Sequence, residues 1–218
     1  MPRSTNTKER ILDAALDLFS ELGYDGVGLR DLARKVGVRE SALYKHFRSK
    51  QDIFHTLVRQ LKDECDKVFA AHGMTGDHDE MIERYRTISV EEMIQFCSDM
   101  FMHNIKDEKT SKFRKMLRWN SSVMRTQTAT ETFCDEDIGA TYYTLYIRDI
   151  LTHYSAVFKE LIDGGVFIEA DPDVTALHFY SPIFLLLTSH DEQKIPEAEA
   201  LHKLEKHVRQ FFKLYNKE

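Results

Sequence analysis

The stretch that decides the fold is residues 23–54, which read GYDGVGLRDLARKVGVRESALYKHFRSKQDIF. Apolar residues recur at helical spacing over residues 29–36 and again over about residues 39–47. Gly37 separates the two runs, and glycine accepts a backbone conformation in tight turns that other residues resist. Two short helices joined in this way are typical of a helix-turn-helix, although the periodicity alone also fits any small helical hairpin.

A longer helix is expected just before this stretch, because apolar residues fall on one face of about residues 7–22. Asn6 stands where an N-cap is expected, and Glu9 follows at the spacing of a capping box. Gly23 marks the end of this helix. A helix with one apolar face must pack on something, so it would brace the two shorter helices. The apolar face consists of Ile11, Ala15, Leu18, Phe19 and Leu22.

This N-terminal region resembles the DNA-binding domain of the TetR family over about residues 7–55. The matching features are Gly23-Tyr24, Leu32-Ala33, Gly37-Val38, Leu43-Tyr44, Phe47 and Ser49-Lys50. The resemblance implies a helix-turn-helix DNA-binding domain at residues 1–50 and a helical ligand-sensing and dimerisation domain at residues 51–218. It also implies a sequence-specific transcription regulator, foremost a repressor, that binds a palindromic double-stranded DNA operator as a homodimer.

The second short helix would be the recognition helix, which enters the major groove of DNA with its exposed side chains. With Leu43 and Phe47 turned inward, Lys45 and Ser41 are among the residues that face outward. A lysine can donate to guanine acceptors, and a serine can pair with several bases. Lys45 and Ser41 are therefore the candidates for reading the base sequence.

The other expected contacts are to phosphates, and the resemblance assigns them to Tyr44, His46 and Lys50, the last at a helix N-terminus that attracts anions. The chain departs from the family at Gly28, where a hydroxyl is usual and only a backbone N–H could contact a phosphate. It also departs at Arg39, where a serine commonly caps the recognition helix. The predicted DNA-binding residues are Gly28, Arg39, Glu40, Ser41, Tyr44, Lys45, His46 and Lys50.

The composition favours an all-α fold, because 9 glycines and 4 prolines in 218 residues are few for a fold that needs many turns. Charge is unevenly placed along the chain. Residues 1–50 hold ten Lys/Arg and seven Asp/Glu, a balance of +3, whereas residues 51–218 hold 20 and 29, a balance of −9. A basic end on an acidic body is what a modular DNA binder would show.

The rest of the chain is predicted to be helical. A long helix over about residues 50–71 is followed by others, including one at about residues 138–163 that is apolar on several sides and so surrounded by protein. Two last helices, at about residues 172–189 and 196–215, carry more apolar surface than one side of a core can bury. The resemblance implies that they form the dimer interface; the alternative is a monomer that buries both in its own core.

A group of aromatic and methionine side chains in residues 51–218 is expected to wall a pocket for a small apolar or aromatic effector, although ordinary core packing explains each one separately. A phenol such as that of Tyr142 or Tyr146 would fix the orientation of the ligand. The predicted lining consists of Met93, Phe96, Met100, Phe113, Met116, Trp119, Tyr142, Tyr143 and Tyr146.

We expect no enzyme, cofactor or metal site, because the sequence has no HExxH, GxSxG or Walker motif. His72, His78, His202 and His207 are interpreted as surface histidines, since their spacing gives them no second ligand on a shared helix face. Scattered cysteines and short apolar runs predict a reduced cytoplasmic protein without membrane segments. The alternatives left open are an activator, a regulator that responds to a protein partner, and a helical enzyme with a vestigial N-terminal module.

Overall fold

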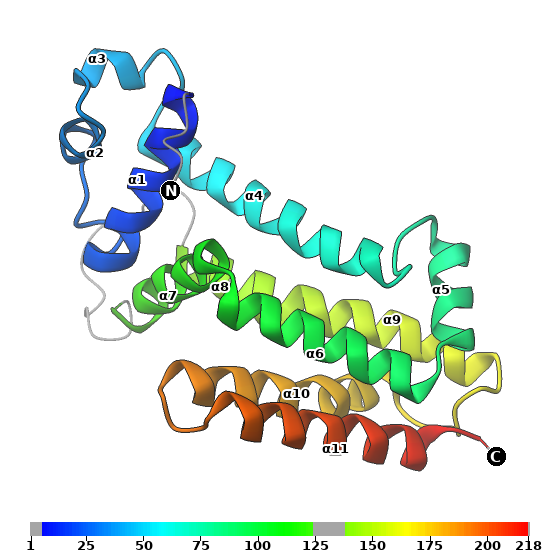
Figure 1. Cartoon of the computed structure of the whole chain (residues 1–218). Helices are drawn as coiled ribbons and strands as arrows, with labels where there is room; N and C mark the ends of the chain where they lie inside the picture. Colours follow the sequence, from blue (N-terminus) through cyan, green and yellow to red (C-terminus); the bar gives the residue numbers. More distant parts are fainter. Residues whose placement is uncertain (1–5, 124–137, 218) are drawn as a thin grey trace, which may run out of the picture. The chain divides into compact units, whose positions relative to one another are not determined.

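The computed structural model of the protein describes residues 6–123 and 138–217 (Figure 1). Within these residues the chain is helical, and the one pairing of extended backbone is an isolated bridge between Phe167 and Asn216. The expected all-α fold class is therefore confirmed. None of the helices in this described part is long and apolar enough to cross a membrane.

Contacts within the chain divide it into two units. Unit 1 comprises Met1–Glu64 and Glu108–Tyr142, and unit 2 comprises Cys65–Asp107 and Tyr143–Glu218. The helix-turn-helix region thus shares a unit with the first part of the long helix after it and with a helix from the middle of the chain. The functional boundary expected after residue 50 stays a prediction, because packing contacts do not report which part of a chain binds DNA.

Unit 1 is built on three N-terminal helices. Its elements are α1 (Thr7–Leu22), α2 (Leu29–Val36), α3 (Glu40–Leu43), the N-terminal part of α4 (Lys50–Ala71), α7 (Glu108–Val123) and most of α8 (Ile138–Tyr143). Helix α1 packs on α2 and on α7, and α2 packs on α3, which confirms the expected bracing by the first helix. The buried residues of this unit include Ile11, Ala15, Phe19, Leu32, Ala33, Leu43, Phe47, Ile53, Phe54, Phe113 and Met116.

The helix ends in this unit form where the sequence predicts them. The side chain of Asn6 accepts a hydrogen bond from the Lys8 N–H at 3.0 Å and so caps α1. Helix α1 stops at Gly23, and α2 stops at Gly37 in the left-handed conformation, with φ +76° and ψ 36°. The Gly37 N–H donates to the Ala33 carbonyl at 2.9 Å, which satisfies one of the last carbonyls of α2.

The recognition helix is shorter than the 39–47 span expected. Regular α-helix covers Glu40–Leu43, and a turn continues the chain to Phe47, whose N–H donates to the Leu43 carbonyl at 2.9 Å. The cap of α4 ends this segment, because Asp52 accepts from the Arg48 N–H at 2.9 Å. The backbone at Arg48 therefore forms the start of α4 and does not extend α3.

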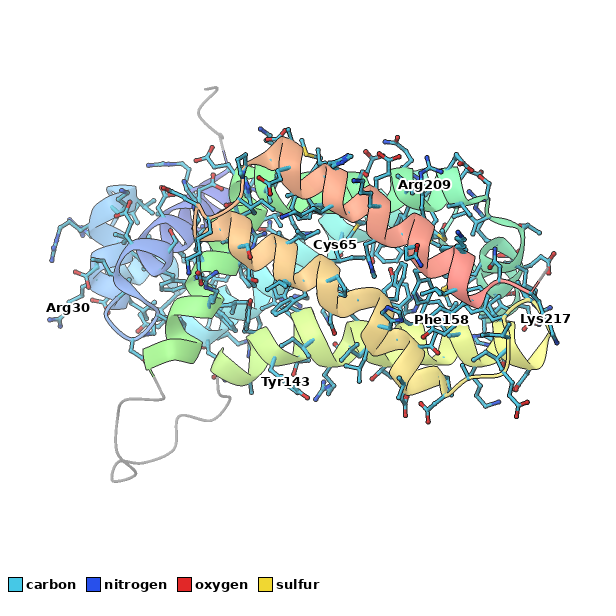
Figure 2. All side chains as sticks on the ribbon, turned by 90° about the horizontal axis from the view of Figure 1, so that it is seen from below. Arg30, Cys65, Tyr143, Phe158, Arg209 and Lys217 are labelled. Atoms are coloured by element: carbon cyan, nitrogen blue, oxygen red, sulfur yellow. The ribbon has the colours of Figure 1, made fainter. Side chains whose placement is uncertain are left out.

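Unit 2 is a bundle of helices with aromatic rings packed in its core. Its elements are the end of α4, α5 (His78–Thr87), α6 (Val90–Lys106), η1 (Thr144–Arg148), α9 (Asp149–Asp163), α10 (Pro172–Asp191) and α11 (Glu197–Tyr215). Helix α10 packs on α9 and α11, and α6 packs on α11. Helices α10 and α11 lie side by side in both views (Figures 1 and 2). In the core, the Phe158 and Phe211 ring centroids lie 5.4 Å apart.

The helix expected over about residues 138–163 contains an interruption. A π-helical turn, η1, separates α8 from α9, and such turns insert an extra residue into the helical ladder. The Tyr180 hydroxyl donates to the Tyr146 carbonyl within this turn at 2.7 Å. The apolar periodicity of residues 138–163 gives no sign of this interruption.

Candidate DNA-binding site

The exposed surface of α3 and the turn after it carries most of the residues predicted to contact DNA. Leu43 and Phe47 are buried, as expected, and Tyr44 is 56% exposed. The other exposed residues of this surface are Arg39, Ser41, Lys45 and His46. The core side of the segment therefore faces inward, and its polar side chains are available to a partner.

Two charged groups next to α3 form a pair that the sequence did not indicate. The Arg30 Nε on α2 donates to the Glu40 Oε2 on α3 at 3.2 Å, and the Arg30 side chain is 85% exposed. Arg39, at the N-cap position of α3, makes no side-chain capping bond, which agrees with the expectation of a weakly capped helix start. Glu40 is therefore held by a cation from the neighbouring helix, which lowers the local negative charge that would oppose DNA.

Gly28 departs from its predicted role. Its N–H was expected to be the group that could contact a phosphate, but it donates to the Asp31 Oδ2 at 2.9 Å in a capping box. Asp31 sits three residues after the cap, where a carboxylate satisfies the first N–H of a helix. A phosphate contact through the Gly28 N–H would have to displace this carboxylate, so we withdraw the prediction.

Lys50, predicted to be a phosphate anchor, makes contacts within unit 1 that the sequence did not indicate. Its Nζ donates to the carbonyls of Tyr24 and Val27, both at 3.0 Å, and lies 4.1 Å from the centre of the Tyr24 ring. The side chain is half-buried. The ammonium thus ties the start of α4 to the loop between α1 and α2, and its role as a phosphate anchor stays a prediction.

Exposed arginines on α2 were missed by the sequence-based prediction, which considered only the recognition helix and its flanks. Arg30 and Arg34 are both exposed, and Arg34 pairs with Asp31 at 3.5 Å. The signal was present, because the apolar face of residues 29–36 leaves these two positions on the outside. They add positive charge to unit 1 next to the predicted contact residues.

Two ion pairs join α1 to α7 inside unit 1. The Lys109 Nζ lies 2.7 Å from the Asp13 Oδ1, and the Lys112 Nζ lies 2.7 Å from the Asp17 Oδ1. Hydrogen bonds to Asp17 and to Glu108 raise the pKa of Lys112 above its ordinary value. Helix α7 is therefore connected to the bracing helix of the helix-turn-helix by charge as well as by apolar packing.

The residues predicted to wall a ligand pocket are divided between the two units. Phe113, Met116 and Tyr142 are buried in unit 1, where Phe113 stacks on Phe54 with ring centroids 6.1 Å apart. The side chain of Trp119 lies outside the described residues. These positions agree with core packing, and their role in binding a ligand stays a prediction.

The unit 2 members of the predicted wall behave differently from one another. Met93, Phe96 and Tyr146 are buried, and Met100 packs partly buried against the same core. Tyr143 is 55% exposed (Figure 2), so the expectation that it faces the interior is wrong. The second apolar row expected on this helix does not turn inward along its whole length, since Tyr143 is exposed and Phe158 is buried.

Unit 2 also buries polar groups that the sequence-based prediction did not single out. The Tyr85 hydroxyl and the His153 Nε2 lie 3.0 Å apart, and Cys97 and Tyr154 are buried in the same core. Burial raises the pKa of Tyr85, raises the pKa of Cys97 to about 12 and lowers the pKa of His153. These groups are therefore uncharged near neutral pH and offer hydrogen bonds without charge.

The expected absence of a metal centre was based on histidine spacing, and part of that interpretation needs correction. His72 is not a surface residue: its side chain is 15% exposed and its Nε2 lies 3.0 Å from the Asp99 Oδ2. His207 is half-buried and bonded to the Phe179 carbonyl at 2.8 Å. Within the described residues, no group of three or more His, Cys, Asp or Glu side chains is placed to hold a metal ion.

The geometry of unit 1 defines a helix-turn-helix module, in which two short helices meet at a left-handed glycine and a longer helix braces them. Residues 11–57 match the family model of bacterial regulatory proteins, tetR family. The chain is 46% identical over 61 residues to IcaR of Staphylococcus aureus strain Newman, the negative transcriptional regulator of the biofilm operon icaADBC. That match covers 28% of this chain and 33% of IcaR, so the chain spans about a third of the length of the relative.

Solved structures match over nearly the whole chain. SmeT in complex with triclosan has a TM-score of 0.66 at 19% identity, covering 97% of this chain and 92% of SmeT. A TetR-like regulator of Rhodococcus sp. RHA1 has a TM-score of 0.61 at 16% identity, covering 96% and 97%. The N-terminal domain is therefore similar to that of the tetR family of bacterial regulatory proteins, and the fold of the chain is similar to those of solved TetR-like regulators.

Proposed function

We propose that this protein is a transcription repressor that binds a palindromic operator as a homodimer and is released from it by a small apolar or aromatic ligand. The observation that carries the proposal is the exposed surface of α3 on a module that matches the TetR family over residues 11–57. Repression is supported by IcaR, whose N-terminal region is similar and which is a negative regulator. Sequence-specific binding by such a module uses side chains that reach the major groove.

Within the module, we assign Lys45 and Ser41 to base edges and Arg39, Tyr44 and His46 to phosphates. Both groups of side chains are exposed on α3 or next to it. Glu40 belongs to the same surface and pairs with Arg30. The Glu40 carboxylate would either accept a hydrogen bond from a cytosine amino group or hold Arg30 in position to contact a phosphate. Base contacts would set the operator sequence, and phosphate contacts would set the orientation of the protein.

The homodimer is proposed on the apolar surface of the last two helices. Four large apolar side chains of α10 and α11 are exposed in the single chain, with Leu185 at 63%. They are Val174, Leu177, Leu185 and Leu214. A second copy related by a twofold axis would bury these side chains and would present two recognition helices to two half-sites of one operator.

The effector is proposed to bind in the larger domain. Unit 2 combines apolar rings with uncharged donors and acceptors such as Tyr85 and His153, a composition that suits an apolar ligand with one hydrogen-bonding group. SmeT, whose fold is similar, forms a complex with triclosan, and this property of SmeT makes the same ligand class reasonable here. Helix α4 contributes to both units, so it is one of the covalent connections by which binding would reach unit 1.

The direct test of DNA binding is selection from a random DNA library, followed by gel shift with the purified chain. We expect an enriched near-palindromic site that is bound by a dimer. Lys45→Ala should relax the preference at one base position at a cost of about 1–3 kcal/mol. Lys62→Ala is the matched control, because Lys62 is exposed on α4 and lies about 18 Å along the helix from Lys50. Recovery of no enriched site at low salt would contradict the proposal.

The effector test is a thermal-shift screen of apolar and aromatic compounds. Compounds that raise the melting temperature are then added to the preformed complex with the selected operator. Release requires that the ligand bind the two states with a difference of about 1–3 kcal/mol. Stabilising compounds that never change the affinity for DNA would separate ligand binding from regulation and would sink the sensing part of the proposal.

A further inference from the structure

Two histidines on the last two helices face each other without a role in the proposed DNA or effector sites. His178 lies on α10 and His207 on α11, and their ring centroids are 6.2 Å apart with an angle of 54° between the rings. His178 is exposed, and His207 is half-buried. The two helices that carry them run side by side (Figure 2). The pair is therefore reachable from solvent in the single chain, and in the proposed homodimer His178 would lie beside Val174 and Leu185, on the face of α10 that the second copy covers.

The hydrogen bond of His207 determines which of its nitrogens is free to bind. Its Nε2 lies 2.8 Å from the Phe179 carbonyl oxygen, which can only accept a hydrogen bond. Nε2 must therefore carry the proton, and Nδ1 carries the lone pair. A histidine whose second nitrogen donates to a backbone carbonyl is the usual arrangement around protein-bound metals, because the bond fixes the tautomer and the ring orientation.

His178 is held in a similar way by a tyrosine. Its Nδ1 lies 3.0 Å from the Tyr215 hydroxyl on α11, and the two ring centroids are 5.6 Å apart. When Nδ1 donates to the phenol oxygen, Nε2 carries the lone pair. In this tautomer each imidazole has one nitrogen bonded within the protein and a lone pair on its other nitrogen.

The separation of the rings suits a shared ion. Zinc binds imidazole nitrogen at about 2.0–2.1 Å, which puts each ring centroid about 3.2 Å from the metal and two centroids on one metal at most about 6.4 Å apart. The 6.2 Å observed is within that limit, and a tetrahedral angle needs an approach of only about 1 Å. A change of this size is within the reach of side-chain rotation by the exposed His178.

The surroundings of the two rings are largely aromatic. The two imidazoles make hydrogen bonds and ring contacts with Phe179, Phe211, Tyr215 and each other. Burial is the main cause that lowers the pKa of His207. Neutral imidazole is the form that binds a metal ion, so this ligand is ready near neutral pH.

We propose that His178 and His207 bind one divalent ion of the borderline class, Zn²⁺, Ni²⁺ or Cu²⁺, between α10 and α11. Imidazole nitrogens suit these ions, and hard ions such as Mg²⁺ and Ca²⁺ prefer oxygen ligands. Water fills the remaining coordination positions in the single chain. The ion would clamp the two helices together, and the inference holds whether or not the chain binds DNA.

The test is calorimetric titration of Zn²⁺ into the full chain, purified without a histidine tag and stripped of metal. We expect one site that is lost in His178→Gln and in His207→Gln and kept in the control His202→Gln, an exposed position on the same helix as His207. Tyr215→Phe removes the hydroxyl that positions His178 and should weaken binding about tenfold. Circular dichroism at each step establishes that the variants are folded.

A second readout keeps binding separate from fold stability. Zn²⁺ should raise the melting temperature of the parent chain and of His202→Gln but leave His178→Gln unchanged, while Mg²⁺ should have no effect on any of them. The inference is overturned if the parent chain binds no Zn²⁺, or if binding persists in both His178→Gln and His207→Gln. Neither outcome would touch the DNA-binding proposal, which is tested on the operator.

Discussion

In unit 1 the polar side chains assigned to a ligand lie on the outside of the helices, whereas in unit 2 the polar groups assigned to a ligand lie inside the core. Lys45 and Ser41 are exposed on α3 and the turn after it, and their role depends on solvent access. Tyr85 is buried and His153 is half-buried among aromatic rings, and the Tyr85 hydroxyl and the His153 Nε2 lie 3.0 Å apart. Exposed binding residues can be identified from the sequence, because they are the positions of a helix that lie outside its apolar face. Buried binding residues cannot be identified in this way, because residues that only pack in the core follow the same apolar pattern.

The largest effect is expected from the aromatic core of unit 2. Phe158 is buried and packs against Phe167, Phe179 and Phe211. Phe158→Ala should lower the free energy of unfolding by about 3–5 kcal/mol, because the cavity cannot close fully. Denaturant unfolding measures this loss, and Phe158→Leu, which keeps most of the volume, serves as the control. A loss below about 1 kcal/mol would mean that Phe158 is not tightly packed. The description of unit 2 as a unit with a closely packed interior would then be wrong.

A smaller effect on stability is expected from replacing Lys50. This variant tests whether the Lys50 side chain holds the loop between α1 and α2 or contacts DNA. Lys50→Met keeps the apolar stem but removes two charge-assisted hydrogen bonds to the carbonyls of Tyr24 and Val27. We expect unfolding to become easier by about 1–3 kcal/mol, measured by chemical denaturation. Lys62→Met is the matched control and should change stability little. Unchanged stability together with a lower salt slope of DNA binding would support the phosphate-anchor assignment.

A third effect concerns the ion pairs between α1 and α7. Asp17→Asn removes the charge that faces Lys112, while Lys112 keeps Glu108 as a second partner. Because the pair is partly exposed, the expected destabilisation is only about 0.2–1 kcal/mol and should shrink further at high salt. Thermal unfolding at two salt concentrations measures it. A loss that is larger at high salt than at low salt would show that the contact is not electrostatic.

The smallest effect is a pH dependence that arises from His153. In the unfolded chain an imidazole titrates near pH 6.5, and burial in the folded chain holds the pKa of His153 below that value. The stability is fully present above about pH 6.5 and is lost as the pH falls toward the folded value. The melting temperature should therefore depend less on pH between about 7.5 and about 5.5 in His153→Gln than in the parent chain. His78→Gln, a change at an exposed position, serves as the control. An identical pH profile in the two variants would contradict the buried, neutral state of His153.

Most of unit 1 could be predicted from the sequence, because its signals are local. The stops at Gly23 and Gly37 and the cap at Asn6 depend on neighbouring residues only, and each is present in the structure. The inward turn of Lys50 could not be predicted, since its partners Tyr24 and Val27 are more than twenty residues away. Local pattern identifies a helix end but not the destination of a long flexible side chain.

Less of unit 2 could be predicted, because its features depend on contacts between helices. The π-helical turn at Thr144–Arg148 and the hydrogen bond from Tyr180 to the Tyr146 carbonyl join segments more than thirty residues apart. Tyr143 is exposed, which contradicts an assignment made from regular spacing. The apolar face of a helix predicts that its residues are buried. It does not indicate whether a ligand or another side chain covers them.

The measurement that tests the central account most directly is the affinity for the selected operator against a scrambled duplex, by fluorescence anisotropy at about 150 mM salt. We expect the operator to bind at least about 10³-fold more tightly, as sequence-specific proteins do. Lys45→Ala should lose most of its discrimination at one base position, and Lys62→Ala should keep the full ratio. Equal affinity of the parent chain for the two duplexes would contradict the account, because the exposed side chains of α3 would then read no sequence.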